Sequence, residues 1–341
     1  MNPAWLLARA LTDPASTAGL DAAGWTRLLT VARAEQLIGS LAHRLHGLPL
    51  PGRVAAILAD ARSAAEQGRM AALWEAEMAR RALGDLGIPV LLLKGTAYVA
   101  AGLSAGQGRS IGDLDLLVPA SALADAETAL LAAGWEWVKA DAYDDAYYRR
   151  WMHELPPLIH RERDRMADVH HTILPPTARR TPDAAALIAD AVPLGEAPGG
   201  LSVLCPEDMV VHATLHLFAD GDLAGGLRNL WDIDRLLREF ADAPGFWPRL
   251  DARAGRHDAI GLVDRAMRQA HALYETPVPE RCRTQRPVDR LYRRRLLARD
   301  GWGRQTRPVT RLAFYVRSHW LRMPPAMLAR HLWTKWRAGR R

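Results

Sequence analysis

The sequence has no long apolar run and very little cysteine. No uninterrupted apolar stretch approaches the length of about 18 residues that a membrane span needs, so we predict no transmembrane segment. The first residues carry neither a basic leader nor a long apolar segment, which predicts no secretory signal. Cys205 and Cys282 fit no metal-binding or redox spacing. We therefore expect two buried or half-buried thiols in a cytoplasmic protein.

Lysine is the second scarce residue type. Only Lys94, Lys139 and Lys335 are lysines, and every other basic side chain apart from histidine is an arginine. Lysine presents a compact ammonium group, whereas arginine presents a planar fork. Position 94 is therefore either a place where a compact cation is needed or a chance occurrence.

Positive charge is concentrated at one end of the chain. Residues 281–341 contain 18 lysines and arginines against two acidic residues, whereas the rest of the chain contains 27 against 36. This basic segment also carries Trp302, Tyr315, Trp320, Trp333 and Trp336. Such a mixture suits contact with a nucleic acid or with an anionic membrane surface. Alternatively, its arginines partly neutralise the acidic body while its aromatic residues pack on it.

A Walker-type phosphate loop and internal repeats are also absent. The glycines at 106, 108 and 112 have neither the Walker spacing nor the Lys-Ser/Thr ending. They are typical of a loop that bends between two strands.

The stretch from residue 90 to residue 118 has the clearest pattern. Val90 to Leu93 forms a short apolar run that predicts a buried strand, and a short helix and a glycine-rich loop follow. A second strand covers residues 113–118. Because side chains alternate along a strand, Asp113 and Asp115 share one face, with Cα atoms about 6–7 Å apart. The two carboxylates suit a pair of Mg²⁺ ions, although solvated acids on an edge strand have the same pattern.

These residues resemble a known signature. Lys94-Gly95-Thr96, then Arg109, then Asp113-x-Asp115 is similar to the signature of polymerase-β-type nucleotidyltransferases, above all to a largely uncharacterised bacterial branch. Members usually have Gly-Ser or Gly-Gly where this chain has Gly95-Thr96, but Thr96 keeps a hydroxyl group. The resemblance extends over about residues 89–279.

The resemblance implies a third acid and a reaction. In the superfamily an acid on a neighbouring strand completes the metal site, and here Asp168-Val169-His170 matches that segment; an acid facing water is the alternative. The implied activity is Mg²⁺-dependent transfer of a nucleoside monophosphate from an NTP to a hydroxyl acceptor. Lys94 and Arg109 would neutralise the phosphates, and Gly95 and Thr96 would lie beside them. The acceptor is open: RNA, a protein, a peptide or a small molecule.

Two other functions fit part of this pattern. The same fold could hold a nucleotide without turning it over, as the partner protein of a biosynthetic or defence cluster, but all three acids are present. A two-metal nuclease or phosphatase needs more clustered acids and histidines than the sequence offers.

A helix beginning at Pro206 carries His212 and His216 four residues apart. It lacks the glutamate of the zinc-protease motif. The family has a similar helix, followed by one that matches Leu227 to Asp232. The resemblance implies that His216, Arg228 and Asp232 line the nucleotide cleft, although a helix-packing network explains them nearly as well.

The predicted fold is therefore α+β. We expect an N-terminal helical region over residues 1–87, with helices at 5–11, 25–45 and 53–86. A polymerase-β-like core with a small mixed sheet follows over 88–204, and a C-terminal helical domain over 205–280. Residues 281–341 form the basic helical tail. In the core, residues 155–160 and 166–173 predict a hairpin that carries Asp168 and His170 on one face, with His170 and His171 in structural roles.

Overall fold

The computed structural model describes residues 2–138, 148–195, 200–324 and 333. It is an α+β structure with one seven-stranded mixed sheet and helices around it, as predicted. Within these ranges no helix is both long and apolar enough to cross a membrane. Both cysteines are free thiols, Cys282 buried and Cys205 half-buried, which confirms the expectation for them.

The N-terminal region consists of helices α1 (Pro3–Thr12), α2 (Ala22–Ala34), α3 (Ile38–Arg44) and α4 (Gly52–Leu83). The prediction of one helix over 25–45 was wrong, because the chain turns between α2 and α3. Gln36 adopts a left-handed φ of +54°, and the Leu37 N–H donates to the carbonyl of Ala32. This bond pattern ends helices, and it buries Leu37 completely.

The sheet has the strand order β3-β4-β5-β2-β1-β7-β6. Its strands are β1 (Val90–Leu92), β2 (Asp113–Leu117), β3 (Trp135–Trp137), β4 (Leu158–His160), β5 (Met166–His170), β6 (Val192–Pro193) and β7 (Leu201–Val203). Strand β2 pairs antiparallel with β1 and parallel with β5. The predicted hairpin is confirmed as β4 and β5. The short edge strand β6 was not predicted.

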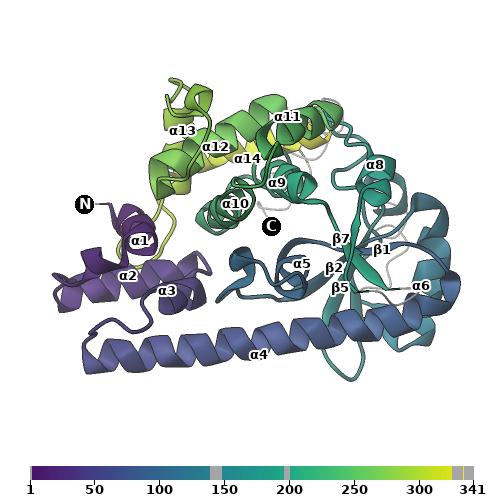
Figure 1. Ribbon diagram of the computed structural model, residues 1–341, viewed down its shortest axis with the longest axis horizontal. Coiled ribbons are helices and arrows are strands. Elements are labelled where there is room, and N and C mark those ends of the chain that lie inside the picture. Colours follow the sequence, from purple (N-terminus) through teal and green to yellow (C-terminus); the bar gives the residue numbers. More distant parts are fainter. Residues whose placement is uncertain (1, 139–147, 196–199, 325–332, 334–341) are drawn as a thin grey trace.

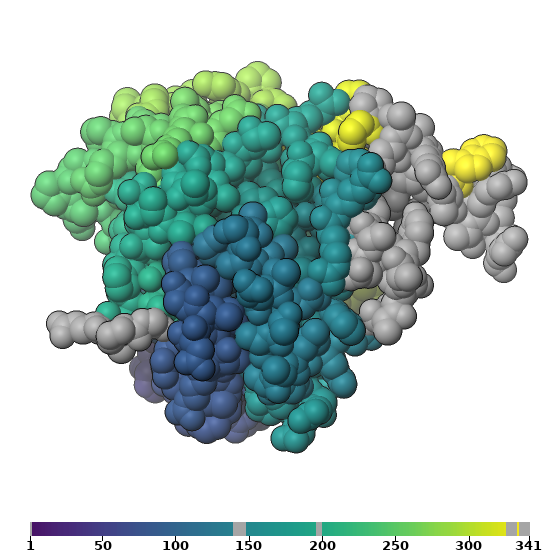
Figure 2. All heavy atoms as spheres, turned by 90° about the vertical axis from the view of Figure 1, so that its right-hand side faces the viewer, coloured from purple at the N-terminus to yellow at the C-terminus, as the bar shows by residue number. Residues whose placement is uncertain are grey.

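Further helices follow along the described part of the chain. They are α5 (Lys94–Ala100), α6 (Leu123–Ala132), α8 (Ala184–Ala189), α9 (Pro206–Leu215), α10 (Gly226–Phe240), α11 (Phe246–Arg256), α12 (Ile260–Tyr274), α13 (Asp289–Leu296) and α14 (Pro308–Arg322). Helix α4 runs along one side of the molecule to the sheet, and α9 to α14 lie on the opposite side (Figure 1). From the sheet end, the blue-to-teal core lies directly against the green C-terminal helices (Figure 2).

Helix α9 ends one residue earlier than the predicted histidine pair requires. It stops at Leu215, and His216 to Asp220 form a π-helical turn. His212 is therefore buried in α9, whereas His216 begins the wider turn that follows it.

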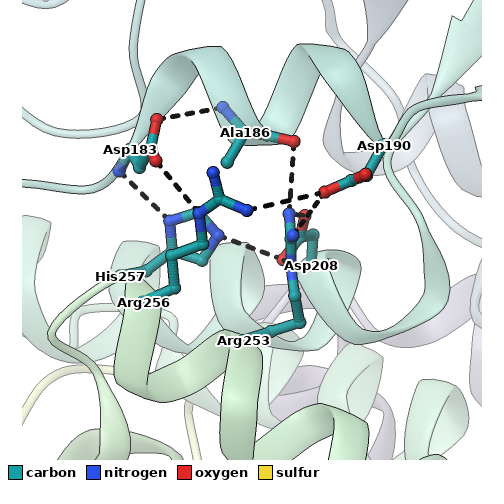
Figure 3. A network of polar contacts seen from close by, with 7 residues as sticks. All are labelled: Asp183, Ala186, Asp190, Asp208, Arg253, Arg256 and His257. Atoms are coloured by element: carbon teal, nitrogen blue, oxygen red, sulfur yellow. Dashed lines mark hydrogen bonds and ion pairs between the residues drawn. The ribbon is translucent and has the colours of Figure 1, made fainter.

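A buried polar network holds α9 in place (Figure 3). Asp208 of α9 is fully buried and accepts hydrogen bonds from Arg253 Nε at 2.8 Å and His257 Nε2 at 3.2 Å. The Nδ1 atom of His257 accepts from the backbone N–H of Asp183, and Arg253 also donates to Asp190. Because a buried carboxylate is costly without partners, these bonds fix α9 against α8 and α11.

The N-terminal helices contact the core through two glycines. A Cβ atom on Gly39 would lie 2.4 Å from the carbonyl oxygen of Gly108, and one on Gly108 would lie 2.3 Å from that of Gly39. Only glycine permits the two backbones to come this close. The contact places α3 against the loop that leads to β2.

The basic segment packs on the body over its described part. Tyr292, Leu296 and Phe314 belong to the main hydrophobic core, and Arg299 Nε lies 2.6 Å from Glu35 Oε1. This core cluster contains residues from all four predicted segments. The boundaries at 87, 204 and 280 remain a prediction.

Candidate metal centre

The register of two parallel strands brings three acids together. Asp115 on β2 lies directly beside Asp168 on β5, and Asp113 precedes Asp115 by two residues on the same face. Partners in a parallel ladder point to the same side of the sheet. One carboxylate oxygen from each of the three acids lies within 4.8 Å of the others, so the three could hold a metal ion.

The three carboxylates differ in environment. Asp113 is exposed, whereas Asp115 is 3% exposed. Burial, reinforced by Asp115 and Asp113, raises the pKa of Asp168 to about 6. The Oδ1 atom of Asp168 is buried and has no hydrogen-bond partner among the residues that the structure describes. A buried acceptor without a donor is costly in a folded protein, and a bound cation would satisfy it.

Lys94 lies against Asp115 at the start of α5. Its Nζ atom is 2.6 Å from Asp115 Oδ1, and the lysine side chain is 24% exposed. The backbone of Lys94 has a left-handed φ of +48°, which is uncommon outside glycine. Burial raises the pKa of Asp115, but Lys94 and His170 together bring it below its usual value. For Lys94, burial lowers the pKa, but Asp115 raises it above the usual value.

Arg109 connects the core to the C-terminal helices. Its Nε atom lies 3.1 Å from Asp232 Oδ2 on α10. On the other side of Asp232, Arg228 Nε lies 3.7 Å from Oδ1. Arg228 also donates from Nη1 to Ser40 Oγ at 3.1 Å, and burial lowers its pKa to about 10. These contacts form a buried network between helices.

Gly95 makes room for the Arg109 guanidinium. A Cβ atom on Gly95 would lie 1.9 Å from Arg109 Nη1 and 2.8 Å from Cζ. The space above Gly95, which we expected a phosphate to approach, is occupied by this side chain. The glycine therefore also has a packing function.

Thr96 and His216 complete the predicted set. Thr96 is buried, and its Oγ1 has no hydrogen-bond partner within the described ranges. His216 is about one-third exposed, and its Nδ1 lies 3.6 Å from Asp220 Oδ2. A cavity of about 410 Å³ lies between α3, α4 and the 102–108 loop, and its lining residues include His43, Arg62 and Gln107. None of the predicted site residues lines this cavity.

Sequence reasoning missed a second polar group beside the acids. His170 Nε2 lies 3.0 Å from Asp115 Oδ1, and its Nδ1 lies 3.3 Å from Glu154 Oε2. The His153 ring stacks on the His170 ring at 5.2 Å. Burial raises the pKa of Glu154 to about 8 and lowers that of His153 to about 3. The sequence indicated His170 only through the strand face that it shares with Asp168. No pattern in the polar, aromatic stretch up to Trp151 indicated His153 or Glu154.

One comparison with known proteins gives a match. A family model described as "Uncharacterised nucleotidyltransferase" matches residues 21–275 of the chain. No curated protein and no solved structure matches it significantly.

Proposed function

Since the chain belongs to this family of uncharacterised nucleotidyltransferases, we propose that it transfers a nucleoside monophosphate from an NTP to an acceptor hydroxyl. One observation carries the proposal. Three carboxylates converge from two in-register parallel strands, and no described residue donates to one buried oxygen of Asp168. An all-oxygen cluster of this kind suits Mg²⁺.

In this proposal Asp113, Asp115 and Asp168 hold the divalent ions. When bound, the ions would neutralise the triphosphate and lower the pKa of the acceptor hydroxyl. His170 donates from Nε2 to the ionised Asp115 and so fixes the direction of its carboxylate. Lys94 adds positive charge at the same carboxylate.

The nucleotide contacts are proposed for residues around this cluster. Lys94 and Arg109 would balance charge on the phosphates, with Gly95 and Thr96 beside them and His216 exposed enough to reach the ligand. Arg228 is buried and would act through Asp232, by holding the carboxylate that positions Arg109.

The activity can be tested by incubating the full chain with each labelled NTP in turn. The first reactions contain Mg²⁺ alone, and the next also contain total RNA or candidate cytoplasmic proteins as acceptors. We expect label transfer that requires Mg²⁺ and falls to background in Asp113→Asn and Asp115→Asn, with the fold retained. Asp60→Asn, at an exposed position of α4, should transfer like the parent. Transfer that is unchanged in both site variants would overturn the assignment. Nucleotide binding without transfer to any acceptor would support the silent, partner-protein alternative.

We further propose that the exposed arginines of the basic segment contact a polyanion, with RNA as the first candidate. Arg295 and Arg322 are paired with Asp222 and Asp220, whereas Arg290 and Arg304 are exposed. RNA affinity should fall steeply between about 50 and 200 mM salt and should weaken in the Arg290→Gln/Arg304→Gln double variant. Sedimentation with anionic vesicles tests the membrane alternative. If the intact protein binds neither, the segment is structural.

A further inference from the structure

A second cluster of potential metal ligands lies next to the acids but is built differently. His153, Glu154 and His170 each offer one ligand atom, and these atoms lie within 4.8 Å of one another. His170 belongs to β5, and the other two residues precede β4. We propose that these three residues form a separate site for a transition-metal dication, with Zn²⁺ as the best-matched ion.

The distances between the ligand atoms fit a tetrahedral ion. Zn²⁺ binds histidine nitrogen and carboxylate oxygen at about 2.0–2.1 Å, which puts neighbouring ligand atoms of a tetrahedron about 3.3 Å apart. His170 Nδ1 and Glu154 Oε2 are 3.3 Å apart, and His153 Nε2 is 3.8 Å from the same oxygen. The first pair therefore has tetrahedral spacing, and the second is about 0.5 Å wider than that spacing.

The hydrogen bonding of the histidines leaves a gap that a metal would fill. His153 is 7% exposed and His170 is 2% exposed. The buried Nδ1 atom of His170 has no hydrogen-bond partner among the described residues, because its contact with Glu154 does not have hydrogen-bond geometry. Buried polar atoms are rarely left in this state. Burial also favours the neutral imidazole, which is the form that binds metal.

The outer contact of His170 matches that of a metal ligand. Its second nitrogen, Nε2, donates to Asp115 Oδ1 at 3.0 Å. Metal-binding histidines almost always give their other N–H to a carboxylate, a carbonyl or water, which fixes the ring and makes it a better ligand. Asp115 would thus contribute to both sites, as a ligand at the acid cluster and as a support at the histidine site.

The donor set separates the two sites chemically. The acid cluster offers oxygen only, which suits Mg²⁺, whereas two imidazoles and a carboxylate select a transition metal. A bound ion would also tie the strand-like segment around Glu154 to β5. That segment already pairs with β5 through a bridge between Glu154 and His170 and through the bond from the Leu155 N–H to the Val169 carbonyl. The proposal requires no nucleotide transfer and is independent of the proposed function.

The test is a metal titration of the untagged full chain, stripped with a chelator and kept in excess Mg²⁺. Zn²⁺ is followed by calorimetry, and Co²⁺ serves as a spectroscopic probe of its ligands. We expect one Zn²⁺ per chain and a tetrahedral Co²⁺ spectrum that Zn²⁺ displaces. His153→Ala and Glu154→Gln should each weaken Zn²⁺ binding by at least about 10–100-fold, with circular dichroism confirming that they are folded.

Two further variants make the result specific. His43→Ala removes an exposed histidine on α3 and should bind Zn²⁺ like the parent. Asp168→Asn removes an acid of the other cluster and should also keep Zn²⁺ binding, which would separate this site from the proposed catalytic one. The proposal is overturned if no Zn²⁺ binds in excess Mg²⁺, if His153→Ala and Glu154→Gln bind like the parent, or if Asp168→Asn abolishes binding.

Discussion

Asp168 gives the candidate metal centre a pH dependence. Its pKa is raised to about 6 by burial and by the neighbouring acids, so the carboxyl group is protonated below pH 6 and ionised above it. Protons then compete with the metal on the acid side. We expect Mn²⁺ affinity, measured by electron paramagnetic resonance in the absence of nucleotide, to be constant above about pH 7. Below pH 6 it should fall about tenfold per pH unit, because one proton is bound for each ion released.

Asp168→Asn should abolish this titration together with most of the affinity, whereas Asp60→Asn should reproduce the parental profile. A Mn²⁺ affinity that stays constant from pH 8 to pH 5 in the parent would show that Asp168 is not a ligand.

The ion pair between Lys94 and Asp115 leads to a second test. Lys94 is paired with the buried Asp115 at 2.6 Å, so removing its charge leaves a carboxylate short of a partner. Lys94→Met keeps the aliphatic stem and a non-glycine residue at the left-handed φ. We expect it to cost about 1–3 kcal/mol of unfolding free energy in urea with chelator present.

Saturating Mg²⁺ should reduce that loss, because a cation again neutralises Asp115, and nucleotide affinity should fall as well. If the loss of stability is equal with and without Mg²⁺ while nucleotide affinity is unchanged, Lys94 is a structural ion-pair partner only.

Gly95 links helix α5 to helix α10 through the Arg109 side chain. A Cβ atom at this position would collide with the guanidinium that contacts Asp232. We expect Gly95→Ala to displace Arg109 and to destabilise the protein by about 1–3 kcal/mol, the usual cost of overpacking. Thermal and urea unfolding measure the loss.

Gly112→Ala is the matched control, since no atom of the described part of the chain, apart from its chain neighbours, lies within 4 Å of the added carbon. It should unfold like the parent. Equal stability of Gly95→Ala and Gly112→Ala would mean that the Arg109 contact adapts without cost.

The basic segment contributes to the main hydrophobic core of the protein. A chain ending at residue 280 loses the buried side chains of Tyr292, Leu296 and Phe314 and leaves Glu35 without Arg299. Each large buried side chain contributes about 1.5–3 kcal/mol, and total stabilities are about 5–15 kcal/mol. We therefore expect the shortened chain to lose cooperative urea unfolding, observed by circular dichroism.

A full-length variant with Arg286, Arg290 and Arg304 replaced by glutamine should keep the parental unfolding midpoint, because these side chains are exposed. This variant is also better suited to binding experiments than the 1–280 chain, because it should stay folded. A 1–280 chain that unfolds at the parental midpoint would show that the segment is separable from the body.

Local pattern alone determined the strands of the site. The alternation of polar and apolar residues at 113–118 put Asp113 and Asp115 on one face, since strand geometry repeats every two residues wherever the strand lies. The same reasoning, with the family resemblance, selected Asp168, and Pro206 marked the start of α9. The break at Gln36 escaped it, because a left-handed residue between two apolar periodic stretches leaves no strong local signal.

The packing of the folded chain sets which groups these side chains face. The pairing of Asp115 with Asp168 depends on the register of two strands, and the contact of Arg109 with Asp232 joins residues 123 positions apart. Glu154 meets His170 only because the segment before β4 pairs with β5. The +16 charge of the last 61 residues likewise did not reveal that Arg299 is paired with the buried Glu35 of the N-terminal region. Composition and period report the face of an element, whereas partners are set by the packing of elements that lie far apart in the chain.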